Sequence, residues 1–103
     1  MNHYLLTIKG DHQHMHGYLM CRDPGIVKRV IRWMGNRMDE VGWGFPPVVL
    51  MTPLSRDIDT VHRIAGKHSR EAAKLISQAT NFHFSTWTMP DDDPDNKWLM
   101  QQH

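Results

Sequence analysis

Three histidines near the start of the chain, His12, His14 and His16, occupy alternate positions and could do chemistry together. A β-strand points alternate side chains to the same face, so a strand here would bring the three imidazoles to one side. Neutral imidazole nitrogens bind divalent transition metals such as zinc. One hypothesis is therefore a metal site, used for metal binding or for metal-dependent hydrolysis.

His83 is the residue that could complete such a site. It lies on the outward-facing parity of a strand expected near the end of the chain, and it would approach His14 and His16 if that strand paired with the histidine hairpin. The competing interpretation is a solvated hairpin whose imidazoles, with ordinary pKa values of about 6.5, gain charge together on acidification. Strand order decides between the two, and spacing alone leaves that order open.

Basic side chains form a second pattern, along two expected helices. They recur at spacings of three and four residues, which puts them on solvent-facing stripes. They are Lys28, Arg29 and Arg32 on the earlier helix and Arg63, Lys67, Arg70 and Lys74 on the later one. If both helices cover the same side of a sheet, the stripes predict a basic surface suited to nucleic-acid phosphates or to an acidic protein. The alternative is an ordinary charged helix exterior, balanced by neighbouring acidic residues.

Aromatic residues outside the periodic segments are candidate anchors for a partner. Trp43 and Phe45 lie in a loop rich in glycine and proline, where they would either bind a partner or close the end of the core. Trp98 and Leu99 follow a run of aspartates, an arrangement typical of short interaction motifs. Packing of Trp98 on the domain is the alternative.

A predicted hairpin positions the histidines. Residues 4–9 alternate as a strand, the pair Gly10-Asp11 forms a turn, and a second strand covers about residues 14–21. With Ile8 opposite Met15, one face of the hairpin collects the expected core side chains, Tyr4, Leu6, Ile8, Met15, Leu19 and Cys21. The histidines then point to the other face, which we expect to meet solvent because buried imidazoles need polar partners.

A helix and a short strand follow the hairpin. Asp23-Pro24 is a helix start, with Asp at the N-cap and Pro in the first turn. The apolar stripe over residues 27–41 ends at Gly42, a typical helix stop. Residues 48–51 are apolar on both faces, so the strand that they predict is expected to be central in the sheet.

A second helix and a last strand complete the pattern. One apolar stripe continues over residues 58–79, which predicts a single long helix that is allowed to bend at Gly66. Residues 82–89 alternate as a strand. The order β-β-α-β-α-β predicts an α+β fold, with a four-stranded, mainly antiparallel sheet and two amphipathic helices on one face.

Length and composition are typical of one globular domain. The chain has 103 residues, of which 40% are hydrophobic and 22% charged, which argues against disorder and against a membrane protein. We assign the domain to residues 1–89 and an acidic, aromatic tail to residues 90–103. Residues 1–90 carry 11 basic against 7 acidic side chains. Cys21 is the only cysteine and no secretory signal is apparent, so we expect a cytoplasmic protein.

These patterns predict a binding protein. No glycine-rich phosphate loop, nucleophile elbow or carboxylate pair is recognisable, so neither enzymatic activity nor a cofactor is expected. We expect an adaptor or inhibitor that acts on a nucleic acid, or on a protein complex that processes one, through the basic helices and the aromatic loop and tail. A protein partner and a homodimer both fit this hypothesis, and small size with eight methionines also suits a phage or mobile-element accessory protein. The alternative is zinc or another divalent transition metal held by the histidines.

Overall fold

Antiparallel strand pairing organises the fold. The computed structural model describes residues 1–41, 48–68, 75–76 and 82–103. Its strands are β1 (Asn2–Lys9), β2 (Gln13–Cys21), β3 (Val49–Leu54), β4 (Leu75–Ile76) and β5 (Phe82–Pro90). Its helices are α1 (Val27–Val41), entered through the 3-10 turn Pro24–Ile26, α2 (Ile58–His68) and α3 (Pro94–Met100). Within these ranges, no helix has the length and apolar character needed to cross a membrane.

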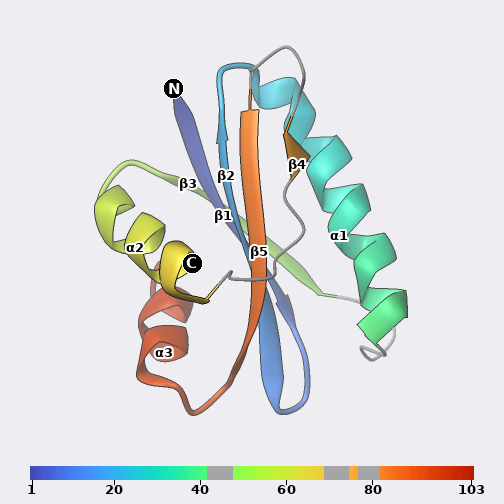
Figure 1. The fold of residues 1–103 in the computed structure, drawn as a ribbon, viewed down its shortest axis with the longest axis vertical. Helices are drawn as coiled ribbons and strands as arrows, with labels where there is room; N and C mark the ends of the chain where they lie inside the picture. The colour runs from blue at the N-terminus through green and yellow to red at the C-terminus, as the bar shows by residue number, and fades with distance from the viewer. Residues whose placement is uncertain (42–47, 69–74, 77–81) are drawn as a thin grey trace.

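The sheet order is β3-β1-β2-β5-β4, and every pairing is antiparallel. The four long strands confirm the predicted α+β class with an antiparallel sheet, and the two residues of β4 extend it beside β5 (Figure 1). The predicted hairpin register is confirmed as well, because Ile8 lies opposite Met15. Among the described strands, β3 is an edge strand rather than the expected central one, since β1 is its one partner there, and Met51 on it is 40% exposed.

The two faces of the sheet are covered by different helices (Figure 1). On one face, α1 packs on the predicted hairpin core. This cluster contains Leu6, Ile8, Met15, Leu19, Cys21 and Phe84 from the strands and Val27, Val30, Met34 and Met38 from α1 and its first turn. The inward face of the hairpin is therefore as predicted.

The opposite face forms a second core beneath α2 and α3. It contains Leu5, Tyr18, Trp87 and Met89 from the sheet and Val61, Ile64, Ala65 and Leu99 from the helices. The expectation of two helices on one face is corrected, because the described residues contain three α-helices, with α1 on one face and α2 and α3 on the other. The physical reason is that these strand side chains are too apolar to be left in water, so their face needs its own cover.

The second predicted helix is shorter than expected. α2 ends at His68, and Leu75 and Ile76 form β4, where they lie opposite Phe84 and His83 of β5. Pairing with the edge of β5 provides the backbone of these two residues with hydrogen-bond partners that a continued helix would have supplied internally. The expected single helix over residues 58–79 is therefore wrong at residues 75 and 76, and residues 69–74 and 77–79 lie outside the described residues.

The segment expected to be a tail carries α3. Asp93 caps this helix by accepting a hydrogen bond from the backbone N–H of Asp95 at 2.8 Å. Asp23 accepts in the same way from Gly25 at 2.8 Å, and the predicted helix start there is confirmed. Because Leu99 of α3 is 0% exposed, residues 94–100 belong to the packed structure.

Candidate functional site

Seven of the eight histidines lie on the side of the sheet that α2 and α3 cover; His14 and His16 are buried in the layer between the sheet and these helices, whereas His62 and His103 are exposed. Four come from strands, two come from α2, and the last is the C-terminal residue. These seven are His3, His14, His16, His83, His62, His68 and His103. His12, the eighth, is exposed between β1 and β2. The fold thus brings together imidazoles that the sequence places far apart.

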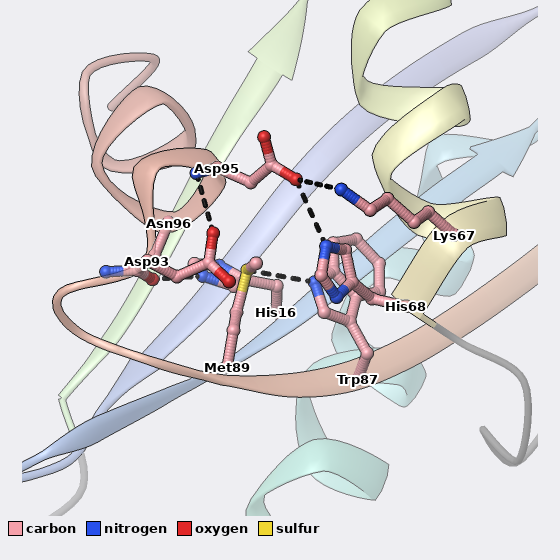
Figure 2. A network of polar contacts seen from close by, with 8 residues as sticks. All are labelled: His16, Lys67, His68, Trp87, Met89, Asp93, Asp95 and Asn96. Carbon is pink, nitrogen blue, oxygen red and sulfur yellow. Dashed lines mark hydrogen bonds and ion pairs between the residues drawn. The ribbon is translucent and has the colours of Figure 1, made fainter.

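A chain of hydrogen bonds runs through this layer beneath α3. His16 is 0% exposed, and its Nδ1 and Nε2 atoms lie 2.8 Å from Thr7 Oγ1 and 2.7 Å from Asn96 Oδ1. Thr7 Oγ1 also lies 2.8 Å from Nε2 of His103, and Nδ1 of His103 lies 2.6 Å from Thr52 Oγ1. The chain therefore links β1, β2 and β3 to α3 and to the C-terminal residue; Figure 2 shows its His16–Asn96 step.

Each hydrogen bond in this series, from Asn96 to Thr52, can be assigned a donor and an acceptor. Asn96 Nδ2 donates to the carbonyl oxygen of Asp91 at 3.3 Å, so Asn96 Oδ1 faces His16 and accepts from its Nε2–H. A neutral His16 then accepts at Nδ1 from the hydroxyl of Thr7. Thr7 in turn accepts from Nε2–H of His103, which leaves Nδ1 of His103 to accept from the Thr52 hydroxyl. Every bond is satisfied when both imidazoles are neutral.

Burial keeps the imidazole of His16 neutral. Desolvation lowers the pKa of His16 from 6.5 to about 4, opposed by the hydrogen bond to Asn96 and assisted by repulsion from His14. Desolvation also lowers the pKa of His103. The ring of Trp87, with its centroid 5.7 Å from that of His16, is part of the surroundings that exclude water. At neutral pH, His16 therefore serves as an uncharged connector between the sheet and α3.

A second polar cluster joins α2 to α3 (Figure 2). Asp95 Oδ2 accepts from Nε2 of His68 at 3.1 Å and lies 3.5 Å from Nζ of Lys67. The hydrogen bond from His68, and then the positive charge of Lys67, lower the pKa of the Asp95 carboxyl. Because Lys67 is 69% exposed, its ion pair contributes little free energy. The cluster mainly orients α3 on the end of α2.

Tyr18 is the centre of a third polar group. Its hydroxyl lies 2.9 Å from Nδ1 of His3, and its ring packs edge-on against His62. Burial, and then the charge of Asp59, raise the pKa of Tyr18. On the neighbouring strand, Ser85 Oγ lies within hydrogen-bond distance of Nε2 of His83, at 3.3 Å. Ser85 is buried, and no described carboxylate contacts His83, so this pair lacks the third member of a hydrolytic triad.

The histidines of the metal hypothesis do not meet at one point. β5 pairs with β2, as that hypothesis requires, but His83 lies opposite Met20. His14 and His16 instead lie opposite Met89 and Trp87, toward the other end of β5. His12 is in the exposed turn, and both nitrogens of His16 are already hydrogen-bonded. In the part of the chain that the structure describes, no three His, Cys, Asp or Glu side chains are grouped to hold a metal ion.

The expected solvent exposure of the histidine face is corrected. As predicted, His14 and His16 point to the other face of the sheet from Met15, but both side chains are buried there. Helix α3 covers this face and supplies Asn96 as the polar partner of His16. Nδ1 of His14 is buried and has no hydrogen-bond partner among the described residues. The face of the sheet on which His14 and His16 lie was therefore predicted correctly, but the burial of that face by α3 was not.

The predicted basic residues are divided between the two faces of the molecule. Lys28, Arg29 and Arg32 are exposed on α1, whereas Arg63 and Lys67 are exposed on α2, on the other side of the sheet (Figure 1). The expected continuous surface is therefore corrected to two separate ones, because the helices do not share a face. Arg70 and Lys74 lie outside the described residues.

Of the predicted partner anchors, the structure describes Trp98 and Leu99, and neither is an exposed side chain. Leu99 is fully buried in the core beneath α2 and α3, and Trp98 is half-buried against the same cluster. The position of Trp98 agrees with the alternative prediction, in which this side chain packs on the domain. Trp43 and Phe45 lie outside the described residues.

A hollow of about 160 Å³ lies beside the exposed basic residues of α1. It is lined by Ile26, Arg29, Val30, Trp33 and Phe82. The ring of Trp33 packs edge-on against buried Phe84, with centroids 5.8 Å apart and planes at 88°. One concave surface therefore combines two partly exposed aromatic rings with a guanidinium group. A second hollow, of about 320 Å³, lies between residues 53–57 and Gln101 and Gln102.

Several of these residues were not identified from the sequence. Thr7, Thr52, Asn96 and His103 have no spacing that relates them, and Trp33 belongs to no motif. One signal was nevertheless present: Asp93-Pro94 repeats the helix start recognised at Asp23-Pro24. Reading it in the same way would have predicted α3.

Comparison with known proteins assigns no family to the chain. No protein-family model matches it, and no curated protein or solved structure is significantly similar to it.

Proposed function

We propose that this chain is a small, non-enzymatic binding protein of the cytosol whose α1 surface binds the phosphate backbone of a nucleic acid. The observation that carries the proposal is the charge on the outer side of α1. Lys28, Arg29 and Arg32 are exposed there, and no acidic residue lies between Pro24 and Met38. Cations that are not neutralised by their own protein displace the counterions condensed on a nucleic acid, which favours binding.

The surroundings of these residues favour α1 over α2 as the binding surface. Asp23, the acidic residue before α1, is engaged as a helix cap. On α2, in contrast, Lys67 is paired with Asp95, and Arg63 shares the helix with Asp59. The positive charge of α2 is thus partly compensated, whereas Lys28, Arg29 and Arg32 have no ion-pair partner among the described residues.

An acidic protein is the competing partner for a basic helix. A nucleic acid is favoured because the hollow with Trp33 and Phe82 adjoins Arg29, and aromatic rings beside cationic side chains are typical of nucleic-acid binding surfaces. A purely acidic protein surface would make no use of the rings.

The test is fluorescence anisotropy with labelled oligonucleotides over a series of salt concentrations. The test variant is Lys28→Gln/Arg29→Gln/Arg32→Gln. Its matched control is Arg56→Gln/Arg63→Gln/Lys67→Gln, which removes the same charge from exposed positions on the α2 side. We expect affinity that falls steeply with salt, and a slope that decreases by about one for each phosphate contact removed in the test variant only.

The outcomes separate the alternatives. An equal loss of oligonucleotide affinity in both variants would mean that net charge, not the α1 surface, determines binding. Absence of binding to any oligonucleotide by the unmodified chain would refute the proposal and leave the acidic protein as the partner to seek.

A further inference from the structure

The hollow beside α1 has the chemistry of a site for a flat, partly polar ring. Its wall is formed by Ile26 and Val30, by the rings of Trp33 and Phe82, and by Arg29 at the same surface. Apolar and aromatic walls favour a planar ligand that gives up water readily, and the guanidinium favours a ligand that carries negative charge nearby. A nucleotide has both properties, because its base is planar and its phosphate is anionic.

The walls are held in place by the core of the protein. Trp33 packs edge-on against Phe84, which is fully buried between the sheet and α1. Phe82 lies on the strand next to β2, opposite Cys21. A ring that enters the hollow therefore meets surfaces that are already ordered, so little side-chain freedom is lost on binding.

The helix also places the hollow and the exposed cations side by side. Ile26, Val30 and Trp33 recur at spacings of four and three residues, so they share one stripe of the helical segment, and Arg29 lies at its margin. Lys28 and Arg32 are one helical turn apart on the adjoining exposed stripe. A nucleic-acid strand with one base in the hollow would thus place its neighbouring phosphates beside these cations.

We propose that this hollow receives an unpaired base of a single-stranded nucleic acid, while Lys28, Arg29 and Arg32 contact the adjoining phosphates. The inference rests on the proposed function of α1 and adds to it the class of nucleic acid. In a duplex the bases are stacked and paired, so their faces do not reach a side pocket. Preference for single strands over duplexes is therefore part of the proposal.

The test compares three labelled probes by anisotropy: oligothymidylate, an abasic oligomer of equal length and charge, and a duplex. We expect the unmodified chain to bind oligothymidylate about 5- to 150-fold more tightly than the abasic oligomer, the range for one stacked base. Trp33→Leu, which keeps an apolar side chain but removes the stacking surface, is expected to abolish this preference. Its affinity for the abasic oligomer and its salt slope should stay unchanged, because the cations remain.

Phe82→Leu is the second variant, in case Trp33→Leu unfolds, and thermal melts establish that each variant is folded. Equal binding of oligothymidylate and the abasic oligomer by the unmodified chain would overturn the pocket and leave the phosphate-binding function standing. Retention of the base preference in both folded variants would overturn it as well, and so would tighter binding to the duplex. If no probe binds at all, the proposed function fails and this inference fails with it.

Discussion

The side-chain oxygen of Asn96 in α3 accepts a hydrogen bond from Nε2 of His16 in β2 at 2.7 Å, although 80 positions separate the two residues. Both side chains are buried. His16 is also hydrogen-bonded to Thr7 of β1, and Thr7 to His103. The His16–Asn96 bond therefore joins α3 to a series of hydrogen bonds that includes the C-terminal residue. The helix is therefore fastened by polar as well as apolar contacts.

Replacing Asn96 by leucine should destabilise the fold. Leucine has a similar size but cannot accept from His16, so a buried N–H loses its partner, which costs about 1–3 kcal/mol. Urea unfolding measures the change in the free energy of unfolding. Lys97→Ala, at the exposed neighbouring position of α3, is the control and should change stability by less than about 0.5 kcal/mol. Equal stability of the two variants would contradict a stabilising role for the His16–Asn96 bond.

Acidification should weaken the fold through His16. Its pKa is about 4 in the folded protein and 6.5 as a free side chain, so between these values the unfolded state binds the additional proton. The stability from neutral His16 is therefore fully present above pH 6.5 and is lost as the pH falls toward 4, by about 3 kcal/mol in total. The lowered pKa of His103 acts in the same direction.

Urea midpoints measured between about pH 7.5 and pH 4.5 test this prediction. That range lies above the ordinary carboxyl pKa of 3.8, so the lowered pKa of Asp95 affects stability only at lower pH. His16→Gln, which cannot gain a proton, should flatten the dependence. His12→Gln removes an exposed histidine from the same hairpin and should leave the dependence unchanged. A wild-type slope in His16→Gln would assign the pH dependence to other groups.

Shortening Leu99 should show that α3 is part of the core. Leu99→Ala removes a fully buried side chain that packs with Leu5, Trp87 and Met89, and this should cost about 2–5 kcal/mol. Val48→Ala, at a position 52% exposed, is a large-to-small control with an expected effect below about 1 kcal/mol. Thermal or urea unfolding distinguishes the two. An effect of Leu99→Ala no larger than that of the control would mean that α3 does not stabilise the sheet.

The parts of the fold that were predictable follow from local rules. The pairing of Ile8 with Met15 was predicted because a short turn and strand alternation leave few registers that bury the apolar side chains. The same strand alternation predicted that His16 points to the other face of the sheet from Ile8. The start of the first helix was predictable because Asp23 caps its own neighbouring backbone.

The remaining features depend on contacts between distant segments. Whether His16 meets water or protein depends on α3, which is positioned by packing of Leu99 and not by any spacing near His16. The place of His83 depends on how β5 is registered against β2, which sets it opposite Met20. Parity along one strand contains no information about either, so the metal hypothesis could be formulated from the sequence but not decided.

Two glycines with opposite surroundings provide a last prediction. A Cβ on Gly17 of β2 would lie 2.7 Å from the ring of buried Phe84 and 3.1 Å from the sulfur of Met34, so Gly17→Ala forces the core under α1 apart and should cost about 1–3 kcal/mol. A Cβ on Gly66 of α2 would meet no atom within 4 Å, so Gly66→Ala should stabilise the helix by about 0.5–1 kcal/mol. Urea unfolding of both variants checks the opposite signs. A neutral Gly17→Ala would mean that Phe84 of β5 and Met34 of α1 pack less closely on Gly17 than these distances require.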